Sequence, residues 1–382
     1  MSSPRLQHVR ELVHHWVEAE DVQTMVVLAA RRGVIVLHEA AGTMAYDPGS
    51  PKTGLDAVFP IASITKVLTA TALMTLVDEG RVGLNRPVAS YIAEFVGEKK
   101  DGVLVRHLLT HTSGLRDEEL DAYATKQQGK LVIPPAPASL HPLFHEYLVE
   151  RYAAPLWKPP GEEMAYAGYN FDLAAEIIRR VSGMSLDRFA YERVFRPLGM
   201  SGTFYCAVDV PNERRVIRRF ASGAAPGPWS DASLSERLWA GSALASSSAI
   251  DMAVLGQMFL NDGAYGDARV LSLASARAMT RNQIPGVRSV FFDQVFPEAC
   301  WGFGWGIRGN KAGWNGALQS PRTFDHGGNG GVYCWVDPED EIVGICFSST
   351  PVATTEEEIS TARWARNGRN DLLADAVTAA IE

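Results

Sequence analysis

Strand-forming segments stand near both ends of this 382-residue chain, and the segment between them is mainly helical in pattern. Near the N-terminus, residues 25–30 and 34–38 are short β-rich runs on either side of an Arg-Arg-Gly turn. Near the C-terminus, residues 331–336 and 341–348 flank an Asp-Pro-Glu-Asp turn, and a helix is expected over 356–381. This arrangement predicts an α+β or α/β fold with one antiparallel sheet, built from N- and C-terminal segments and flanked by helices.

The middle of the chain carries helix signals. Residues 64–79 and 171–181 have apolar side chains at helical spacing, and a glycine follows each segment closely. Another helix is expected over 248–260, where the Ser248 hydroxyl can cap the first turn. Residues 116–160 are less regular and rich in proline and tyrosine, which predicts a mobile flap or wall over a site.

The length of the chain exceeds that of one simple domain. We predict an α/β domain formed by residues 1–84 and 288–382, and a mainly helical inserted domain formed by residues 85–287. The active site is expected at the interface of these two units.

The net charge and hydropathy of the chain limit the classes of partner that it is expected to bind. The net charge of −8, with arginines scattered along the chain, disfavours nucleic acid and anionic membranes as partners. No segment reaches the roughly 18 consecutive apolar residues that a membrane helix needs. The partner that we expect is therefore a small-molecule ester or amide substrate, and the sequence leaves the oligomeric state open.

The first residues and the cysteines bear on location. A polar start runs into a helix-like stretch over 6–19 without the apolar core of a secretory signal, so we expect a cytoplasmic protein. The four cysteines show no C-x-x-C spacing, and buried free thiols are expected. A bridge between Cys334 and Cys346, which lie on two apolar runs, is the alternative that a cytosolic setting disfavours.

A possible nucleophile stands where the first long helix begins. Ser63-Ile64-Thr65-Lys66 fits the pattern S-x-x-K, which places the lysine one helical turn after the serine and close enough to take the hydroxyl proton. The alternative is a capping serine followed by a solvated lysine. Because an ordinary lysine is protonated at neutral pH, a role as base requires Lys66 to be buried.

Further blocks follow in order along the chain. The four blocks are Phe59-Pro60-Ile61-Ala62-Ser63-Ile64-Thr65-Lys66, Arg106-His107-Leu108-Leu109-Thr110-His111-Thr112-Ser113-Gly114-Leu115, Pro160-Gly161 with Tyr166, and Asp325-His326-Gly327-Gly328. Their order and separation resemble the class C β-lactamase-like serine hydrolases, which include penicillin-binding-protein-like peptidases, acyltransferases and family VIII carboxylesterases. The resemblance covers most of the chain and implies a β-lactamase/transpeptidase-like fold without a cofactor or metal.

The second motif of that family is Y-x-N, and the matching segment is Tyr166-Ala167-Gly168. The resemblance implies that the Tyr166 phenol works with Lys66 to relay the serine proton to the leaving group. The motif asparagine, whose amide orients the lysine and holds the acylamino group of a lactam, is missing. Asn170 is the residue expected to compensate in part.

The third motif is K-T-G in lactamases and His326-Gly327-Gly328 here. A lysine at this place helps to anchor the carboxylate of a penicillin, whereas His326 is largely neutral at neutral pH. The resemblance also implies an oxyanion hole formed by the backbone N–H groups of Ser63 and Asn329. Gly327 and Gly328 are expected to let backbone and substrate approach closely.

Three other features of the sequence bear on its chemistry. Trp305, in the aromatic run 301–306, is a candidate for the acyl pocket, with core packing as the alternative. His107 and His111 lack a third ligand at zinc spacing, and the resemblance makes their block structural. The absence of a G-x-S-x-G elbow argues against an α/β-hydrolase.

These observations lead to a function. We expect a serine hydrolase that cleaves carboxylic esters of small substrates through a Ser63 acyl-enzyme. The missing asparagine, His326 in place of lysine and the expected cytoplasmic location favour esters over lactams. The alternatives are a β-lactamase, a D-amino-acid peptidase or amidase, or an acyltransferase on the same site, and, less favoured, a non-catalytic binding or sensor protein.

Overall fold

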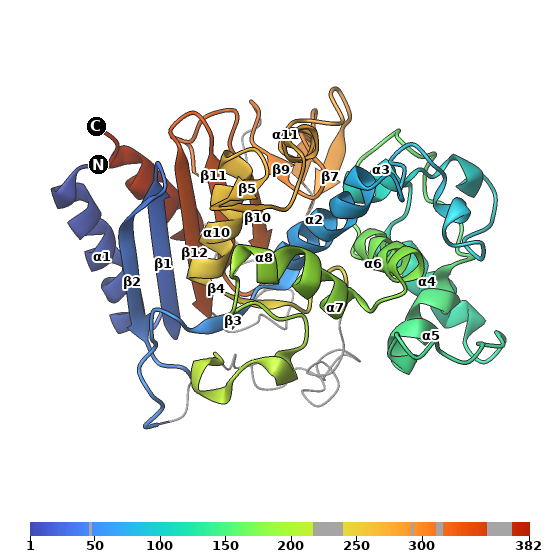
Figure 1. The fold of residues 1–382 in the computed structure, drawn as a ribbon, viewed down its shortest axis with the longest axis horizontal. Coiled ribbons are helices and arrows are strands. Elements are labelled where there is room, and N and C mark those ends of the chain that lie inside the picture. Colours follow the sequence, from blue (N-terminus) through green and yellow to red (C-terminus); the bar gives the residue numbers. More distant parts are fainter. Residues whose placement is uncertain (46–47, 217–239, 292–293, 311–315, 350–368) are drawn as a thin grey trace.

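A six-stranded antiparallel sheet joins the two ends of the chain (Figure 1). The computed structural model describes residues 1–45, 48–216, 240–291, 294–310, 316–349 and 369–382. The strands, in spatial order, are β2 (Val34–Gly42), β1 (Thr24–Arg31), β12 (Ile342–Ser349), β11 (Val332–Asp337), β10 (Phe324–Gly328) and β9 (Gly306–Ile307). Because β1 pairs with β12, the first and last strands meet in the middle of the sheet, which confirms the predicted fold class.

Side chains alternate between the two faces of this sheet. Val26 and Leu28 of β1 belong to the large core cluster, whereas Met25 and Val27 belong to a second, smaller cluster. Because successive side chains of a strand point to opposite faces, neighbouring apolar residues of β1 are buried in different clusters. The central strands are therefore covered on both faces.

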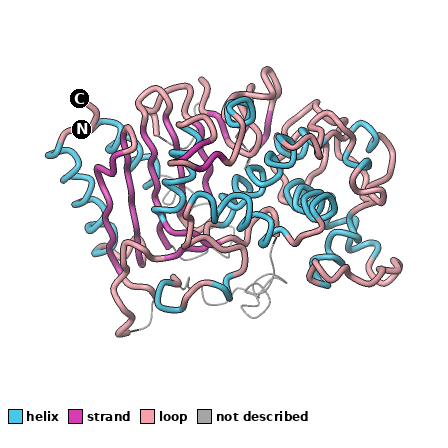
Figure 2. The backbone as a smooth tube through the Cα atoms, viewed as in Figure 1, coloured by secondary structure: helices cyan, strands magenta, loops and turns pink. Residues whose placement is uncertain are grey.

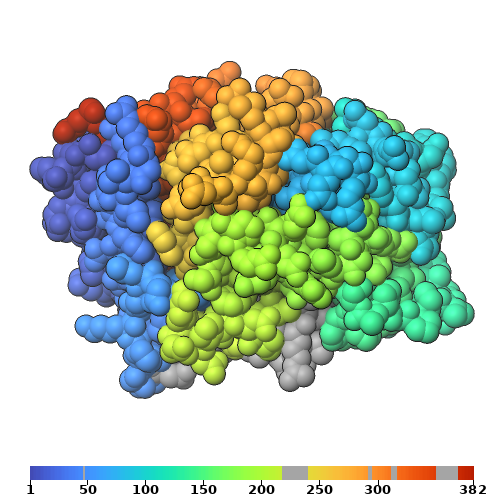
Figure 3. Space-filling view, viewed as in Figure 1, coloured from blue at the N-terminus to red at the C-terminus, as the bar shows by residue number. Residues whose placement is uncertain are grey.

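Different helices cover the two faces (Figures 1 and 2). Helix α1 (Ser3–Glu18) and the helical residues 369–379 contribute to the smaller cluster, and α10 (Ala249–Leu260) packs on the other face against β1, β11 and β12. Figure 3 shows that residues from widely separated parts of the chain form the surface of the molecule on the α10 side. The expected C-terminal helix is thus confirmed over 369–379, and its expected start at residue 356 lies outside the described residues.

Helices dominate the region beside the sheet. Helix α2 (Thr65–Asp78) runs from the sheet into this region and packs on α6 (Tyr169–Ser182), which ends at Gly183 as expected. The other helices are α3 (Val105–Leu109), α4 (Asp117–Gln127), α5 (Pro142–Arg151), α7 (Leu186–Ala190), α8 (Arg196–Leu198) and α11 (Leu273–Met279). The single-turn helices are η1 (Ala62–Ile64), η2 (Val88–Ser90), η3 (Lys100–Gly102), η4 (Tyr191–Phe195), η5 (Ala207–Asp209) and η6 (Asn212–Arg214).

Residues 116–160 differ from the expectation of an irregular flap, because α4 and α5 occupy much of this segment. Helix α10, which falls within the predicted helical unit 85–287, packs on the sheet. The large hydrophobic cluster also runs continuously from the sheet through α2 to α6. The sheet layer therefore includes residues of both predicted units.

The remaining strands form three small pairs. They are β3 (Val58–Pro60) with β4 (Ser246–Ser248), β5 (Ala264–Tyr265) with β6 (Ala268–Arg269), and β7 (Ser289–Phe291) with β8 (Gln294–Phe296). The first pair is functionally relevant, because β3 leads directly into the Ser63 turn.

Cysteines and helix lengths agree with other expectations. All four cysteines are buried, and none of them is in a disulfide bond. Cys334 and Cys346 lie on neighbouring strands but belong to clusters on opposite faces of the sheet, so their side chains point apart. None of the helices in the described part of the chain is long and apolar enough to cross a membrane.

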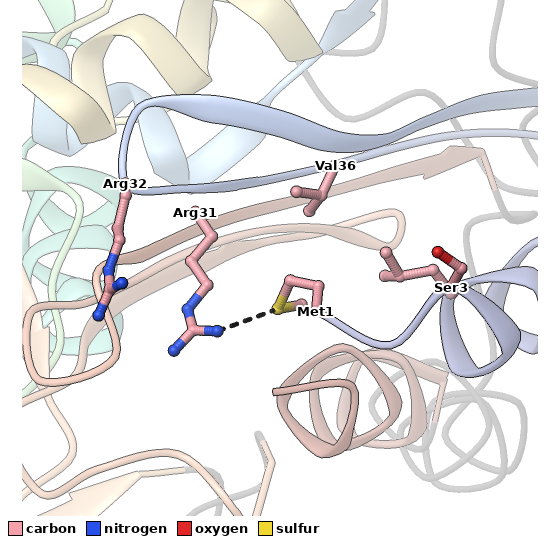
Figure 4. Close-up of a pocket in the computed structure, with 6 residues that line it drawn as sticks. Met1, Ser3, Arg31, Arg32 and Val36 are labelled. Atoms are coloured by element: carbon pink, nitrogen blue, oxygen red, sulfur yellow. Dashed lines mark hydrogen bonds between the residues drawn. The ribbon is translucent and has the colours of Figure 1, made fainter. Parts of the chain in front are cut away.

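A surface pocket of about 410 Å³ lies between α1 and the β1–β2 hairpin (Figure 4). Its lining includes Met1, Arg31 and Arg32, and the Arg32 side chain is paired with Glu341. The pocket lies at the β2 edge of the sheet, whereas the Ser63 turn packs beside β10 at the other end of the strand order. It therefore belongs to a different part of the molecule from the S-x-x-K motif.

Candidate active site

Ser63 lies in the tight η1 turn that opens α2. The preceding residue, Ala62, has a φ of 44°, a left-handed conformation that costs energy for a residue with a Cβ. Thr65 holds the turn: its hydroxyl donates to the Ala62 carbonyl over 2.6 Å and accepts the Ala245 N–H over 3.1 Å. The partly exposed Ser63 side chain is thereby presented on a strained and firmly held turn.

Lys66 is buried, as a role as base requires. Its side chain lies one turn along α2 and the residue is 2% exposed. The Nζ atom donates to Ser63 Oγ over 3.3 Å and to the Ser242 carbonyl over 2.8 Å, and it lies 4.8 Å from the centre of the Tyr166 ring. The structure thus brings the three predicted catalytic residues together around one nitrogen atom.

A buried histidine supports Tyr166. The His111 ring stacks on the Tyr166 ring with centroids 4.3 Å apart and an angle of 28° between the planes. His111 Nδ1 accepts the Ala167 N–H over 3.1 Å, so the hydrogen atom of the neutral ring resides on Nε2. Burial, and next the charge of Lys66, hold the pKa of His111 well below its usual range. His111 is therefore an uncharged platform that fixes the motif tyrosine.

The third motif lies on β10 beside the same site. His326 is 3% exposed, and its ring lies 6.3 Å from the Tyr166 ring. Its Nδ1 lies 2.7 Å from the Gly327 carbonyl, which accepts a hydrogen bond from it. Burial, followed by the charge of Lys66, lowers the pKa of His326 to about 3. The imidazole is thus neutral throughout the physiological pH range.

Gly328 lets β10 approach the Ser63 turn. A Cβ at this position would lie 2.5 Å from the Ile61 carbonyl oxygen and 3.2 Å from the Ala62 Cβ, so a larger residue does not fit. The pairing of β9 with β10 covers only Phe324 and Asp325. The rest of β10, up to Gly328, and the exposed Asn329 in the turn after it lie beyond that pairing, and the oxyanion role of the Asn329 N–H stays a prediction.

Two expected substrate-binding residues lie elsewhere. Asn170 is fully buried, accepts a hydrogen bond from Ser113 Oγ over 2.6 Å and lies 3.5 Å from His111, so its amide is used inside the protein. Trp305 is also fully buried and packs edge-on against Phe259 and Phe324, in the core rather than in an acyl pocket.

Trp301 is the aromatic residue of the 301–306 run that borders the site. Its ring lies 5.3 Å from that of His111, 5.8 Å from that of His326 and 6.1 Å from that of Tyr166. Trp301 therefore lies beside the rings of the motif residues, whereas Trp305 packs in the core.

Sequence reasoning also missed two carboxylates near Lys66, the half-buried Asp117 and the buried Asp172. Asp117 accepts the N–H groups of Gly168 and Tyr169 over 2.6 and 3.3 Å and thus caps α6. Asp172, on the first turn of α6, accepts the Ser242 N–H over 3.1 Å. Neither residue belongs to a family motif, and no local signal in the sequence marks them.

His107 and His111, the two histidines four positions apart, accept hydrogen bonds from different parts of the backbone. His107 is in α3, where its Nδ1 accepts the Leu104 N–H over 3.2 Å, and His111 lies beyond the end of that helix. Among the residues that the structure describes, no three His, Cys, Asp or Glu side chains form a group that could hold a metal ion.

Comparison with known proteins identifies the family. Residues 9–367 match the family model described as Beta-lactamase. The chain belongs to the beta-lactamase family. The protein is a serine hydrolase of this family, and Ser63 of the S-x-x-K motif stays the predicted nucleophile.

Members similar to this chain have diverse activities. A candidate D-alanyl-D-alanine carboxypeptidase of Salmonella typhi is 26% identical over 361 residues, covering 85% of this chain and 78% of that protein. A penicillin-binding-protein homologue from Caulobacter crescentus has a TM-score of 0.75 at 21% identity, covering 100% of this chain and 99% of the other. The hydrolase EstCE1, described as having promiscuous acyltransferase activity, has a TM-score of 0.74 at 20% identity and covers 98% of each chain. The structural matches establish the fold, and the substrate has to be argued from the site.

Proposed function

We propose that this beta-lactamase-family hydrolase cleaves carboxylic esters of small, uncharged substrates through an acyl-enzyme on Ser63. The observation that carries this proposal is the state of His326, which is buried and neutral where lactamases have a lysine. A penicillin or a D-alanyl-D-alanine peptide presents a carboxylate next to the scissile bond. A neutral imidazole cannot form an ion pair with that carboxylate, whereas an ester without a charge needs no such partner.

The second motif supports the same substrate class. Gly168 has no side chain to bind the acylamino group of a lactam, and the nearest candidate, Asn170, is engaged with Ser113. An ester also has an alkoxide leaving group, which depends less on protonation than an amine does. The site is thus better suited to an ester than to an amide.

The proposed reaction starts from the form of the enzyme in which the Lys66 amine has given up its proton, so that this amine can take the proton of Ser63. The Ser63 oxygen attacks the ester carbonyl, and the N–H groups of Ser63 and Asn329 stabilise the oxyanion. Collapse of the tetrahedral intermediate releases the alcohol, which receives its proton through Lys66 and Tyr166. Water then attacks the acyl-enzyme with the same residues acting in reverse and frees Ser63.

The substrate preference can be tested by turnover of a short-chain p-nitrophenyl ester and a chromogenic cephalosporin by the same preparation. We expect kcat/KM for the ester to exceed that for the cephalosporin by at least about 100-fold, since a missing carboxylate partner alone costs about 2–3 kcal/mol. Comparable values would show that Gly168 and His326 do not exclude lactams. Activity toward D-amino-acid peptides but not esters would favour the peptidase alternative, and acyl transfer in the presence of an alcohol would favour the acyltransferase. The cytoplasmic location stays a prediction alongside this proposal.

A further inference from the structure

Asp172 is a buried carboxylic acid close to the base. It lies on the first turn of α6 and is 2% exposed. Its Oδ1 accepts the Ser242 N–H over 3.1 Å, and the Ser242 side chain also helps to lower the pKa of this carboxyl group. A carboxylate that accepts a backbone N–H fixes the backbone at that residue.

Ser242 in turn contacts Lys66. Its carbonyl accepts a hydrogen bond from Lys66 Nζ over 2.8 Å, which is shorter than the 3.3 Å between that nitrogen and Ser63 Oγ. An amine that donates to a fixed carbonyl has its remaining hydrogen atoms and lone pair restricted in direction. The position of the Ser242 carbonyl therefore decides how the Lys66 nitrogen faces Ser63.

The loop of residues 240–245 is held on several sides. Thr69 donates to the Gly241 carbonyl over 2.7 Å, and Ala245 is bonded to the Ser63 turn through both its N–H and its carbonyl. A Cβ at Gly241 would lie 2.2 Å from the Phe171 carbonyl oxygen, so the loop is pressed against the start of α6. Asp172 is next to Phe171 in this helix and bonds the one loop residue that contacts Lys66.

We propose that Asp172 is a positioning residue, which orients Lys66 through the Ser242 carbonyl and so replaces the missing asparagine of the second motif. At Gly168, where that asparagine would stand, a Cβ would meet the Ser242 Cβ at 3.5 Å and the Asp117 Oδ2 at 3.4 Å. Ser242 thus lies against the place from which the asparagine would act. The inference rests on the proposed Ser63 reaction but not on the choice of ester as substrate.

Charged groups on several elements surround this carboxyl group. Lys66 of α2 and Asp117 of α4 interact electrostatically with Asp172, as do the phenols of Tyr147 in α5 and Tyr169 in α6. Burial is the largest cause that raises the pKa of Asp172 to about 7, and the hydrogen bonds from Ser242 and the charge of Lys66 oppose it. Asp172 consequently changes its charge around neutral pH, and with it the strength of the hydrogen bond that it accepts from the Ser242 N–H.

The test is the rate at which a fluorophosphonate probe labels Ser63 in the full chain, measured with kcat and KM for an ester across pH. D172A removes the acceptor, and we expect both labelling and kcat to fall about 10- to 100-fold with KM within about twofold, because a displacement of about 1 Å in a base has such an effect. D172N keeps an acceptor oxygen for Ser242. It is expected to retain labelling within about fivefold at alkaline pH and to lack the inflection near neutral pH that we expect for the original protein.

Asp251 gives a matched control, since it is also a buried carboxylate that holds backbone. It accepts the Gly202 N–H over 2.7 Å and the Thr203 hydroxyl over 2.8 Å, and neither partner has a hydrogen bond to Lys66 or Ser242 in the described part of the chain. D251A is expected to lower the melting temperature but to leave the labelling rate of the folded protein unchanged.

Equal labelling rates for D172A and the original protein would overturn the inference, as would an unchanged inflection in D172N. A loss in D172A that only follows the folded fraction, as in D251A, would also overturn it. If D172A does not fold, the pH profile of D172N decides. Failure of the probe to label Ser63 in the original protein would instead contradict the proposed Ser63 chemistry, so the two failures are distinguishable.

Discussion

Replacement of Ser63 by alanine is expected to lower kcat by about 10⁴- to 10⁶-fold, the range found when the nucleophile of a serine hydrolase is removed. The Ser63 hydroxyl oxygen lies 3.3 Å from Lys66 Nζ, and the proposed reaction has no other group that could form the acyl bond. Ser63 is only partly buried, and the turn around it is held by Thr65 and Ala245 rather than by its own side chain. The melting temperature should therefore stay within about 2 °C of the original.

Steady-state kinetics with an ester and thermal unfolding of the same preparation measure both quantities. Ser90→Ala, which changes an exposed serine in η2, serves as the control and should keep full activity. Activity in S63A above about one-thousandth of the original would show that another residue, or water activated directly, performs the attack.

Replacement of Lys66 by methionine is expected to lower kcat by about 10³- to 10⁴-fold. Methionine has a similar length but no amine, so the Ser63 proton loses its acceptor, and general-base catalysis contributes up to about this amount. The Ser242 carbonyl also loses its donor, whereas the cost of burying an amine disappears. Because these two effects on the free energy of unfolding oppose each other, the protein should remain folded.

Lys66→Arg separates the two roles of the side chain. Arginine keeps the positive charge but cannot give up its proton under these conditions, so it cannot act as a base. We expect K66R to be as inactive as K66M, measured as kcat and as the rate of fluorophosphonate labelling. More than about a tenth of the original activity in K66R would show that the position supplies charge rather than base catalysis.

The sheet could be predicted because its strands carry local signals, namely apolar runs bounded by turn residues at both ends of the chain. The helices within 116–160 could not, since their signals are weak or ambiguous. Helix α4 buries only Leu120 and Ala124, so its sequence carries little apolar periodicity. Helix α5 begins with Pro142, which favours the first turn of a helix as readily as it favours a loop.

The site was predictable where its residues are close in sequence. Ser63 and Lys66 lie one helical turn apart, and their meeting follows from helix geometry. The contact between Lys66 and Ser242 joins residues 176 positions apart, and that between Asp172 and Ser242 spans 70. Such contacts depend on how loops pack, which local pattern does not encode.

Asn170 and Trp305, two of the expected substrate-binding residues, are buried for similar geometric reasons. Asn170 and Asp172 are two positions apart on α6, so they point to different sides of the helix, and only Asp172 faces the loop at Ser242. Trp301 and Trp305 are separated by a turn in which Gly304 has a φ of 88°. This turn sends one ring to the site and the other into the core, a reversal that an aromatic run alone does not reveal.

The most direct test of the central claim is rapid-quench mass spectrometry. The protein is mixed with a short-chain p-nitrophenyl ester, quenched within the first turnovers and digested, and its peptides are then weighed. The proposed chemistry predicts a transient gain of one acyl group on the peptide that contains Ser63, with the adduct absent from S63A. Turnover without such an adduct, or an acyl group on another residue, would contradict the assignment of Ser63 as the nucleophile.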